Sequence, residues 1–398
     1  MWEKDINIEE IREIRVKTTV FFGIGAIKKI DSICSQLSKR GIHKIIAVTG
    51  KGAYKKTGAW DHVLEAFAKH GIDYVHYDGI TPNPEADPID EAVKIAKDFG
   101  AQAVLGIGGG SSIDAAKAVS ALLAYPEHDA RSISEGVAIR KALPILAINL
   151  THGTGSEVDR FSVLTIPETN HKLSLTADCL YPLYSINDPQ LMTGLGAEQT
   201  AYVSVDAVNH VLEACSTKLA SPFSILLAKE VVRLVAEYLP KALKDPMDLP
   251  ARYYLSYASM MAGTAFDNGL LHITHALEHP LSGLKTETIH GQGLALLLPA
   301  VLKRVFEARK HTIFEVLQPI LGELDFETAT GEMVAAATRN WLHSVGIKES
   351  LRDLGFGEEH LDKLTELVYE TPGLKGLLGL APIEVTPELV RTIFAESL

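Results

Sequence analysis

The first half of the chain alternates short β-branched or aromatic runs with longer stretches in which apolar residues have helical spacing. The runs are bounded by glycine, proline or polar residues, as strands are. Strands that alternate with amphipathic helices predict a parallel sheet covered on both faces. The six predicted strands are TTVFFG (18–23), HKIIAVTG (43–50), DYVHYDG (73–79), AQAVLGIG (101–108), LPILAINL (143–150) and YSINDP (184–189).

The pattern changes after Pro189. Residues 197–217, 221–243 and 251–266 carry apolar side chains at intervals of three and four, which is typical of helices. A chain of 398 residues also exceeds what one hydrophobic core usually supports. We therefore predict an α/β domain over residues 1–190 and an all-α domain over residues 191–398, packed closely enough to share a cleft.

Composition and charge exclude several classes of protein. With 46% hydrophobic and 22% charged residues, the chain resembles ordinary globular proteins rather than disordered or fibrous ones. The net charge of -12 argues against nucleic acid or an anionic membrane as a partner. The charged start MWEKD and the lack of a long apolar run predict a cytoplasmic protein. Three cysteines without CxxC spacing predict neither a disulfide framework nor a thiolate metal site.

A glycine-rich turn, GGGSS at 108–112, follows the fourth predicted strand and precedes a helix that opens with Asp114. Glycines allow close approach of a ligand, and a helix N-terminus favours an anion such as a pyrophosphate. A tight connection between strand and helix is the equally simple alternative. A second loop, residues 150–160, carries the hydroxyl donors Thr151 and Thr154 beside glycines and suits the same ligand, or is an ordinary turn.

Histidine is abundant, with 15 in the chain, and several lie in the helical half. Asp206 and His210 are one helical turn apart and so share a face. His272, His275 and His279 are spaced by three and four residues in LLHITHALEHPLSG, a helix that we expect to end at Pro280 to Gly283, and His290 follows in TIHGQG. A carboxylate with several imidazoles and no thiolate suits divalent iron or zinc.

Six motifs along the chain together resemble the iron-containing (group III) alcohol dehydrogenases. In order, they are GGGSSIDAAKA, GTGSEVDR, DAVNHVLEA, AFDNGLLHITHALEHPLSG, IHGQGLALLLP and SVGIKESLRDLGF. The resemblance runs from about Val20 to the C-terminus. It implies a dehydroquinate synthase-like fold, with a Rossmann-like dinucleotide-binding α/β domain, an all-α metal-binding domain, and the metal at the cleft.

The resemblance also implies roles for particular residues. The implied ligands of Fe2+, with Zn2+ as the alternative ion, are Asp206, His210, His275 and His290. His279 matches a histidine close to the reacting centre. We expect His279, or His272 with water, to relay the substrate proton, because imidazole titrates near neutral pH.

The implied cofactor-binding residues lie in the first half, and the implied pocket residues are two phenylalanines. Gly109, Gly110 and Ser111 would hold the pyrophosphate, and Thr151, Thr154, Val163 and Lys172 would line the adenine-ribose or nicotinamide path. Asp114 is grouped with these residues. Phe161 and Phe266 would shape the substrate pocket.

The chain departs from the family pattern at a few positions. His272 and His152 replace residues that are usually small, and Asp159 stands where Thr or Asn is common. One extra residue separates His279 from His290.

The end of the second strand bears on the choice of nicotinamide cofactor. In such sheets an acidic residue there bonds the ribose 2′-hydroxyl and repels a 2′-phosphate. This chain has Gly50 instead, followed by Lys51 and, nearby, Lys55 and Lys56. We therefore predict NADP(H) rather than NAD(H), the butanol-dehydrogenase-like branch of the family; the alternative is that these lysines form a solvated surface.

The resulting hypothesis is an alcohol dehydrogenase or aldehyde reductase that transfers a hydride between NADP(H) and a small primary alcohol or aldehyde, with the metal polarising the substrate oxygen. We expect a homodimer. The alternatives are a glycerol dehydrogenase or a dehydroquinate-synthase-like enzyme on the same fold, and, more remotely, a non-catalytic metal- or nucleotide-binding protein.

Overall fold

The computed structural model describes residues 1–398, which divide into two compact units. One unit is Val16–Leu195, and the other combines Gly196–Leu398 with Met1–Arg15. The sequence analysis assigned residues 1–15 to the α/β domain, whereas in the structure they pack with the helical unit. The division after Leu195 lies five residues beyond the predicted one.

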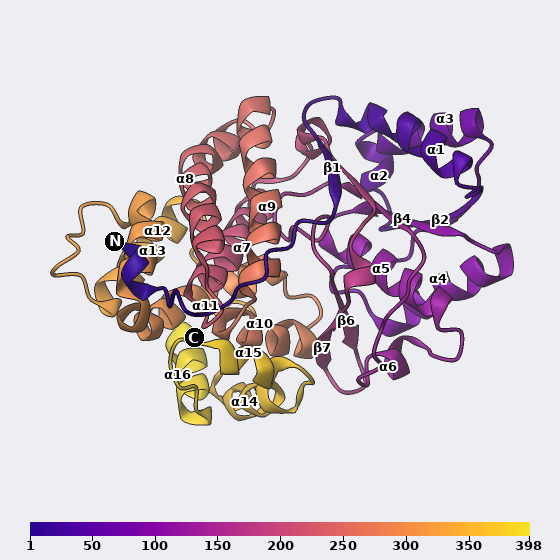
Figure 1. Cartoon of the computed structure of the whole chain (residues 1–398). Helices are drawn as coiled ribbons and strands as arrows, with labels where there is room; N and C mark the ends of the chain where they lie inside the picture. Colours follow the sequence, from indigo (N-terminus) through magenta and orange to yellow (C-terminus); the bar gives the residue numbers. More distant parts are fainter. The chain divides into compact units, whose positions relative to one another are not determined.

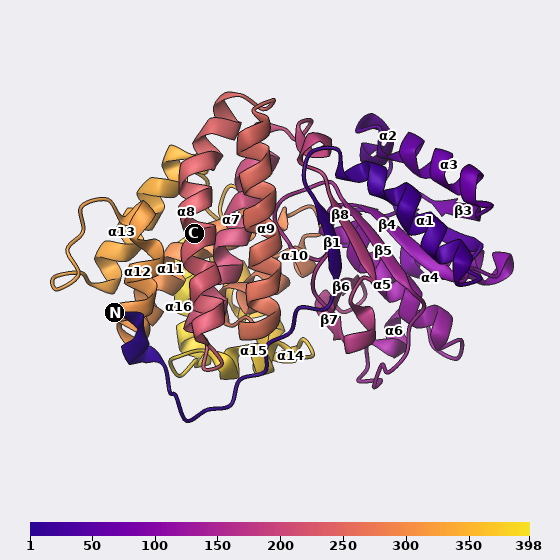
Figure 2. The same cartoon turned by 45° about the horizontal axis from the view of Figure 1, so that its top comes forward.

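The unit Val16–Leu195 contains a six-stranded parallel sheet (Figures 1 and 2). Each of the six predicted runs contributes one strand, and all neighbouring strands pair in parallel. In spatial order the strands are β1 (Thr19–Phe22), β8 (Tyr184–Asn187), β5 (Ile145–Asn149), β4 (Ala103–Gly108), β2 (Lys44–Thr49) and β3 (Asp73–Tyr77).

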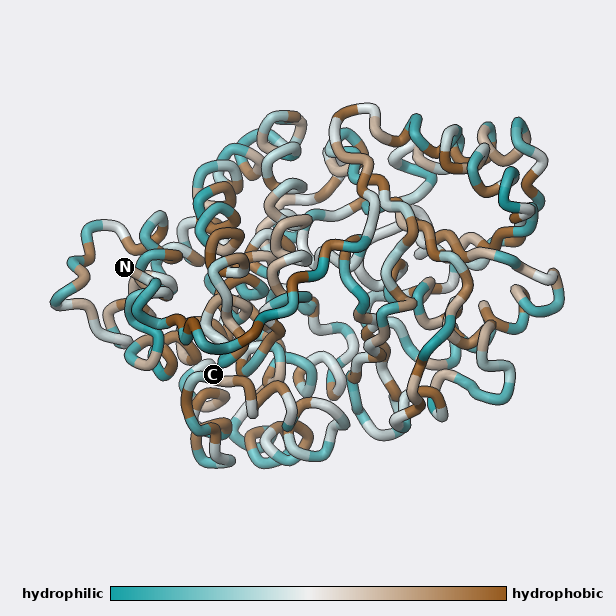
Figure 3. Tube along the Cα trace, in the orientation of Figure 1, coloured by the Kyte–Doolittle hydropathy of each residue, from teal (hydrophilic) through white to brown (hydrophobic).

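Helices cover both faces of this sheet, as the strand–helix alternation predicts. One core joins α1 (Ile30–Lys39) and α3 (Ala59–His70) to the first face, and a second core joins α4 (Ala86–Phe99) and α5 (Gly110–Ala124) to the other. The central strands β4 and β5 are therefore buried along their whole length, and brown, hydrophobic segments of the tube run through this unit in Figure 3.

The strand order creates a switch point between β2 and β4. From β2 the chain crosses the first face through α3 to the outer strand β3, whereas from β4 it crosses the opposite face through α5 to β5. In open sheets of this kind ligands bind outside the carboxyl ends of the strands at such a point. Gly50 follows β2 and Gly109 follows β4, so the topology brings the two loops of interest to that edge.

An antiparallel hairpin adds two strands that the sequence analysis did not predict. β6 (Phe161–Ile166) pairs with β7 (His171–Thr176), and the turn includes Asn170 in the left-handed region at φ 57°. Leu164 and Leu173 bury one face against α4 and α5. Val163 and Lys172, expected along the cofactor path, therefore lie on a hairpin rather than in an irregular loop.

The second unit is helical, as predicted. α7 (Ala197–Ser216), α8 (Pro222–Lys244) and α9 (Leu249–Gly269) pack against one another, and α7 also packs on α11 (His290–Val305). The other long helices are α10 (Ile273–Leu284), α12 (Lys310–Leu321), α13 (Gly331–Ser344), α14 (Leu361–Glu370) and α16 (Pro387–Ser397). Nearly every residue of α7 is buried, including its polar ones. No helix is both long enough and apolar enough to cross a membrane.

The helix that carries the histidines ends near its predicted limit but begins later than expected. α10 spans Ile273–Leu284, so it ends one residue beyond the predicted range of Pro280 to Gly283. His272 is the residue before the helix, with φ -142° and ψ -108°, and does not share the face of His275 and His279. The expected row of three histidines is therefore a pair.

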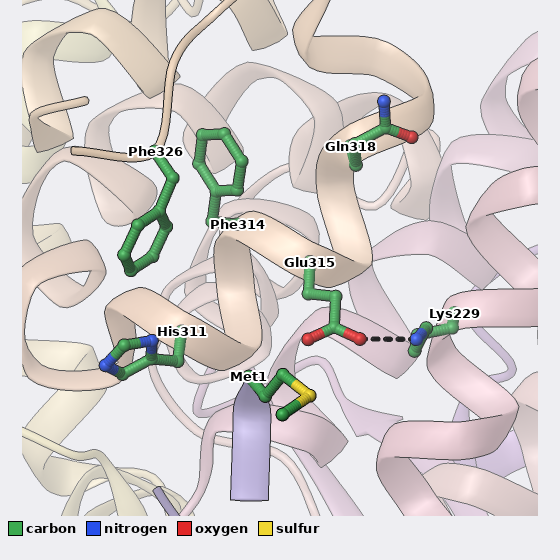
Figure 4. A pocket seen from close by; sticks show the side chains of 7 residues that line it. All are labelled: Met1, Lys229, His311, Phe314, Glu315, Gln318 and Phe326. Atoms are coloured by element: carbon green, nitrogen blue, oxygen red, sulfur yellow. Dashed lines mark hydrogen bonds and ion pairs between the residues drawn. The ribbon is translucent and has the colours of Figure 1, made fainter. Parts of the chain in front are cut away.

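The first 15 residues run along the helical unit and begin with a short 3-10 helix, Trp2–Asp5. The Asp5 carboxylate accepts hydrogen bonds from the backbone N–H and the hydroxyl of Thr312, both at 2.8 Å, at the start of α12. A hollow of about 340 Å³ lies beside Met1 (Figure 4), where Glu315 accepts a hydrogen bond from Lys229 at 2.5 Å. None of the residues lining it is a predicted site residue.

Candidate functional site

α7 places three acidic or imidazole side chains on one buried face. Asp206, His210 and Glu213 follow one another at intervals of four and three residues, so they stack along the helix. All three are buried. Burial of this many polar groups on one helix face is costly unless they bind partners.

Two further histidines reach the same point from α10 and α11. His275 lies in the first turn of α10, and His290 is the first residue of α11. One ligand atom each of Asp206, His275 and His290 lie within 4.8 Å of one another. Nδ1 of His210 lies 3.4 Å from Oδ1 of Asp206, and its ring stacks on that of His275 with centroids 4.6 Å apart.

The polar atoms that meet here lack hydrogen-bond partners. Oδ1 of Asp206, Nδ1 of His210 and Nε2 of His275 are buried and form no hydrogen bond. Each such group costs about 1–3 kcal/mol if it stays unsatisfied. A divalent cation would satisfy all three at once, and one carboxylate with imidazoles is a donor set that iron and zinc accept. The donor atoms of Asp206, His275 and His290 therefore fit one metal ion, and His210 lies beside them.

The electrostatics of the cluster favour the same conclusion. Burial raises the pKa of Asp206, but the imidazoles of His210, His275 and His290 outweigh it and lower that pKa to about 2. Burial also lowers the pKa of His210 to about 3. An ionised carboxylate and a neutral imidazole are the forms that bind metals.

Two carboxylates behind the histidines escaped the sequence analysis. Glu213 accepts a hydrogen bond from Nδ1 of His275 at 2.5 Å, and Glu278 is bonded to Nδ1 of His290. Metal-binding histidines usually donate their second ring N–H to such a partner. Glu213 follows His210 by three residues, and Glu278 follows His275 by three, so the helical spacing could have revealed both.

The two histidines expected to relay a proton occupy different places. His279 is buried one turn after His275, with its ring centroid 6.0 Å from that of His290. His272 lies behind Glu213: its Nε2 is 2.9 Å from the Ser216 hydroxyl, and its Nδ1 is 3.4 Å from Glu213. The structure thus brings His279, and not His272, beside the cluster of Asp206, His275 and His290.

Of the two predicted pocket residues, Phe266 contacts the histidine cluster. Its ring stacks on His210 with centroids 4.6 Å apart, near the end of α9. Phe161 begins β6 in the other unit, where its carbonyl accepts a hydrogen bond from Lys117.

In the unit Val16–Leu195, the glycine turn fits tightly against the loop that follows β5. A Cβ at Gly109 would lie 2.9 Å from Thr151, and one at Gly110 would lie 2.5 Å from Thr154. Both glycines are thus required by packing within the protein. The first N–H groups of α5, those of Gly110 and Ser111, have no hydrogen-bond partner, and no side chain caps the helix. These donors fit the pyrophosphate of a dinucleotide.

A buried network ties α5 to the same loop and to β6. Lys117 donates hydrogen bonds to Ser156 at 2.9 Å and to Asp159 at 2.7 Å. Asp114 accepts hydrogen bonds from Ser156 and from the backbone N–H of Val163 at 3.1 Å. Asp114 and Val163, grouped with the cofactor-binding residues by resemblance, are thus bonded to each other in this structure.

The remaining predicted cofactor residues occupy different environments. Lys172 is buried on β7 and donates a hydrogen bond to Asn83 at 2.9 Å. Gly50 faces the carbonyl of Ile80, which a Cβ would approach to 3.2 Å. Lys51 and Lys55 are exposed, and Nζ of Lys55 lies over the ring of Tyr54, 5.3 Å from its centroid.

Comparison with known proteins identifies the family. Residues 17–189 match the model "Iron-containing alcohol dehydrogenase", and residues 200–398 match "Fe-containing alcohol dehydrogenase family, C-terminal". The chain belongs to the iron-containing alcohol dehydrogenase family. It is 52% identical over 398 residues to the long-chain primary alcohol dehydrogenase AdhA of Thermoanaerobacter ethanolicus, and the match covers 100% of both chains. The chain is therefore an alcohol dehydrogenase, and the family implies iron and a nicotinamide nucleotide as cofactors.

More distant relatives and solved structures agree with this membership. NADH-dependent butanol dehydrogenase B of Clostridium acetobutylicum is 30% identical over 400 residues, covering 97% of this chain and 99% of that one. The structure of NADH-dependent butanol dehydrogenase A from Thermotoga maritima matches with a TM-score of 0.87 at 32% identity, covering 98% of each chain. The predicted fold class is confirmed.

Proposed function

We propose that Asp206, His210, His275 and His290 hold a divalent iron ion. The observation that carries this proposal is the set of buried polar atoms at Asp206, His210 and His275 that face one another without hydrogen bonds. When bound, the metal supplies Lewis-acid polarisation of the substrate oxygen. The protein keeps the donor atoms together by burying them between three helices.

The residues around the ligands would orient the substrate and move its proton. Phe266, stacked on His210, supplies an apolar surface for the carbon chain of an alcohol. His279 lies beside His290 and would pass the hydroxyl proton to solvent as a general base, with His272 as the less direct alternative because it bonds to Ser216. His279→Asn should lower kcat by about 100-fold while leaving the metal content unchanged. Unchanged turnover would remove His279 from the mechanism.

The nucleotide would bind at the carboxyl edge of the sheet. The N–H groups of Gly110 and Ser111 would bind the pyrophosphate, with Gly109, Thr151 and Thr154 forming the adjacent surface. Lys172 and Val163 of the hairpin would extend this surface. Asp114 would act by fixing the position of Val163 through its hydrogen bond.

We propose NADP(H) as the preferred nucleotide, because Gly50 leaves no carboxylate at the end of β2 and Lys51 and Lys55 follow. The names of the NADH-dependent relatives argue for NAD(H). The test is kcat/KM with NADPH against NADH in the wild type and in Lys51→Glu. The proposal is supported if the NADPH/NADH ratio of kcat/KM is above one in the wild type and lower in Lys51→Glu. A wild-type ratio at or below one contradicts it.

The proposed substrates are primary alcohols and their aldehydes, of small size and extending to longer chains. The 52% identity to a long-chain primary alcohol dehydrogenase supports the longer ones. Absorbance at 340 nm with NADPH and aldehydes from ethanal to decanal, measured anaerobically on protein of known metal content, tests this proposal. Oxidation of NADPH that depends on both metal and aldehyde is expected. A homodimeric assembly and a cytoplasmic location remain predictions.

A further inference from the structure

One buried carboxylate near the histidine cluster is bonded to a proposed ligand. Glu278, on α10, is fully buried, and its Oε2 is bonded to Nδ1 of His290 on α11. Gly293, one turn after His290, leaves the space that this side chain occupies, because a Cβ there would lie 3.0 Å from Cγ of Glu278. The two helices are therefore fitted around this carboxylate.

Glu213 differs from Glu278 because it also supports the backbone of a helix. It accepts a hydrogen bond from Nδ1 of His275, but it also accepts one from the backbone N–H of Thr274 in the first turn of α10. Its removal would disturb the start of that helix as well as the histidine. The hydrogen bond of Glu278 to His290 links side chain to side chain, so a substitution at Glu278 tests the histidine more directly.

His290 is the ligand that most needs such support. It is the most exposed member of its cluster with Asp206 and His275, and it stands at the first position of α11. The positive end of a helix dipole disfavours a cation at that position. A carboxylate on the second ring nitrogen fixes the imidazole tautomer and ring orientation, and its charge opposes the helix end.

We propose that Glu278 is a positioning residue that orients His290 toward Asp206 and His275 and tightens the binding of the divalent ion. This inference rests on the proposed metal centre. The alternative is that Glu278 only fills the space beside Gly293.

The test is a chelator-competition titration of metal-free protein with Fe2+ under anaerobic conditions, and with Co2+ as a spectroscopic substitute. Glu278→Ala should raise the dissociation constant about 10- to 100-fold and alter the visible spectrum of bound Co2+. Glu278→Gln, which can still accept the hydrogen bond but lacks the charge, should give a smaller increase. The control is Glu315→Gln, whose carboxylate pairs with Lys229 in the same unit. It should bind metal as the wild type does.

Circular dichroism of the metal-free variants shows whether they are folded. If Glu278→Ala is unfolded, the metal affinity of Glu278→Gln serves as the test. Folded variants that bind metal as tightly as the wild type, with an unchanged Co2+ spectrum, would overturn the role of Glu278 while leaving the metal centre intact. A wild-type protein that binds no metal would instead contradict the proposed metal centre itself, and this inference with it.

Discussion

At the scale of single residues, the buried charges of the helical unit converge on one point. Asp206 faces the imidazoles of His210 and His275, and Glu213 supports His275 from the opposite side. Burial lowers the pKa of His275, but Glu213 and Asp206 outweigh it and raise that pKa to about 9. Binding of a divalent cation would therefore displace the proton of the His275 ring, because metal binding is coupled to proton release.

Replacing one ligand should therefore remove metal and activity together. We expect His275→Ala or His290→Ala to lose both, because the remaining donors are too few to hold the ion. The matched control is His311→Ala, which alters a histidine beside the hollow near Met1. Metal analysis and the 340 nm assay on the same samples make the comparison. Retention of metal and activity in both ligand variants would refute the ligand set.

A second prediction concerns the buried Lys117 network of the nucleotide-binding unit. Burial raises the pKa of Asp159 to about 7, with Lys117 opposing and Asp114 adding to the rise. The unfolded carboxyl has a pKa of about 3.9. Between these two pKa values the Asp159 carboxyl is protonated in the folded state but not in the unfolded state. This proton stabilises the folded state; the contribution is fully present below the unfolded pKa and is lost as the pH rises through about 7.

Asp159→Asn removes this titration. The stability of the wild type relative to Asp159→Asn should fall as the pH rises from 4 toward 7, as measured by denaturant unfolding at each pH. An exposed carboxyl such as Asp61, changed to Asn, is the control and should show no such trend. A constant difference between wild type and Asp159→Asn across this range would contradict the assigned pKa.

At the scale of elements, the N-terminal segment acts as a remote cap. α12 begins at Lys310 without a capping side chain of its own, and Asp5 supplies the missing acceptor for Thr312 from about 300 residues away in sequence. The segment alternates brown and teal in Figure 3, and Ile8 and Ile11 are almost fully exposed. Its attachment therefore depends on a few polar contacts, such as that of Asp5.

Asp5→Ala should destabilise the folded protein by about 1 kcal/mol, the usual value of a helix cap. Thermal or denaturant unfolding measures the difference. Glu3→Ala, in the same 3-10 helix but exposed, is the control and should change stability little. Equal effects of the two substitutions would show that Asp5 does not cap α12.

The sequence predicted helices and strands well where hydrophobic periodicity was strong. It predicted them poorly where contacts between residues distant in sequence determine the structure. All six sheet strands and the helical second half followed from the pattern, whereas the β6–β7 hairpin did not, because its burial depends on α4 and α5. His272 was predicted within the helix of His275, but it is the residue before that helix, where its ring contacts Ser216. Asp206 and His275 came from spacing and resemblance. The spacing also places Glu278 one turn after His275, but its bond to His290 could not be predicted, because His290 lies on the next helix.

At the scale of the whole molecule, the residues proposed to bind the nucleotide and those proposed to bind the metal lie in different units. The unit Val16–Leu195 contains the glycine turn, and the helical unit contains the histidine cluster. Removal of the metal by a chelator should therefore abolish turnover but leave the binding of NADPH, followed by its fluorescence, within about twofold of its original affinity. Loss of nucleotide binding on chelation would show that the metal also holds the nucleotide site together.

The central claim is that the cluster of Asp206, His210, His275 and His290 is a metal centre on which alcohol oxidation depends. The most direct measurement is metal reconstitution: the chelated protein is titrated anaerobically with Fe2+ while NADPH oxidation with butanal is followed at 340 nm. We expect activity to be absent without metal and to rise linearly to a plateau at one equivalent of metal per chain. Full activity in demonstrably metal-free protein would contradict it.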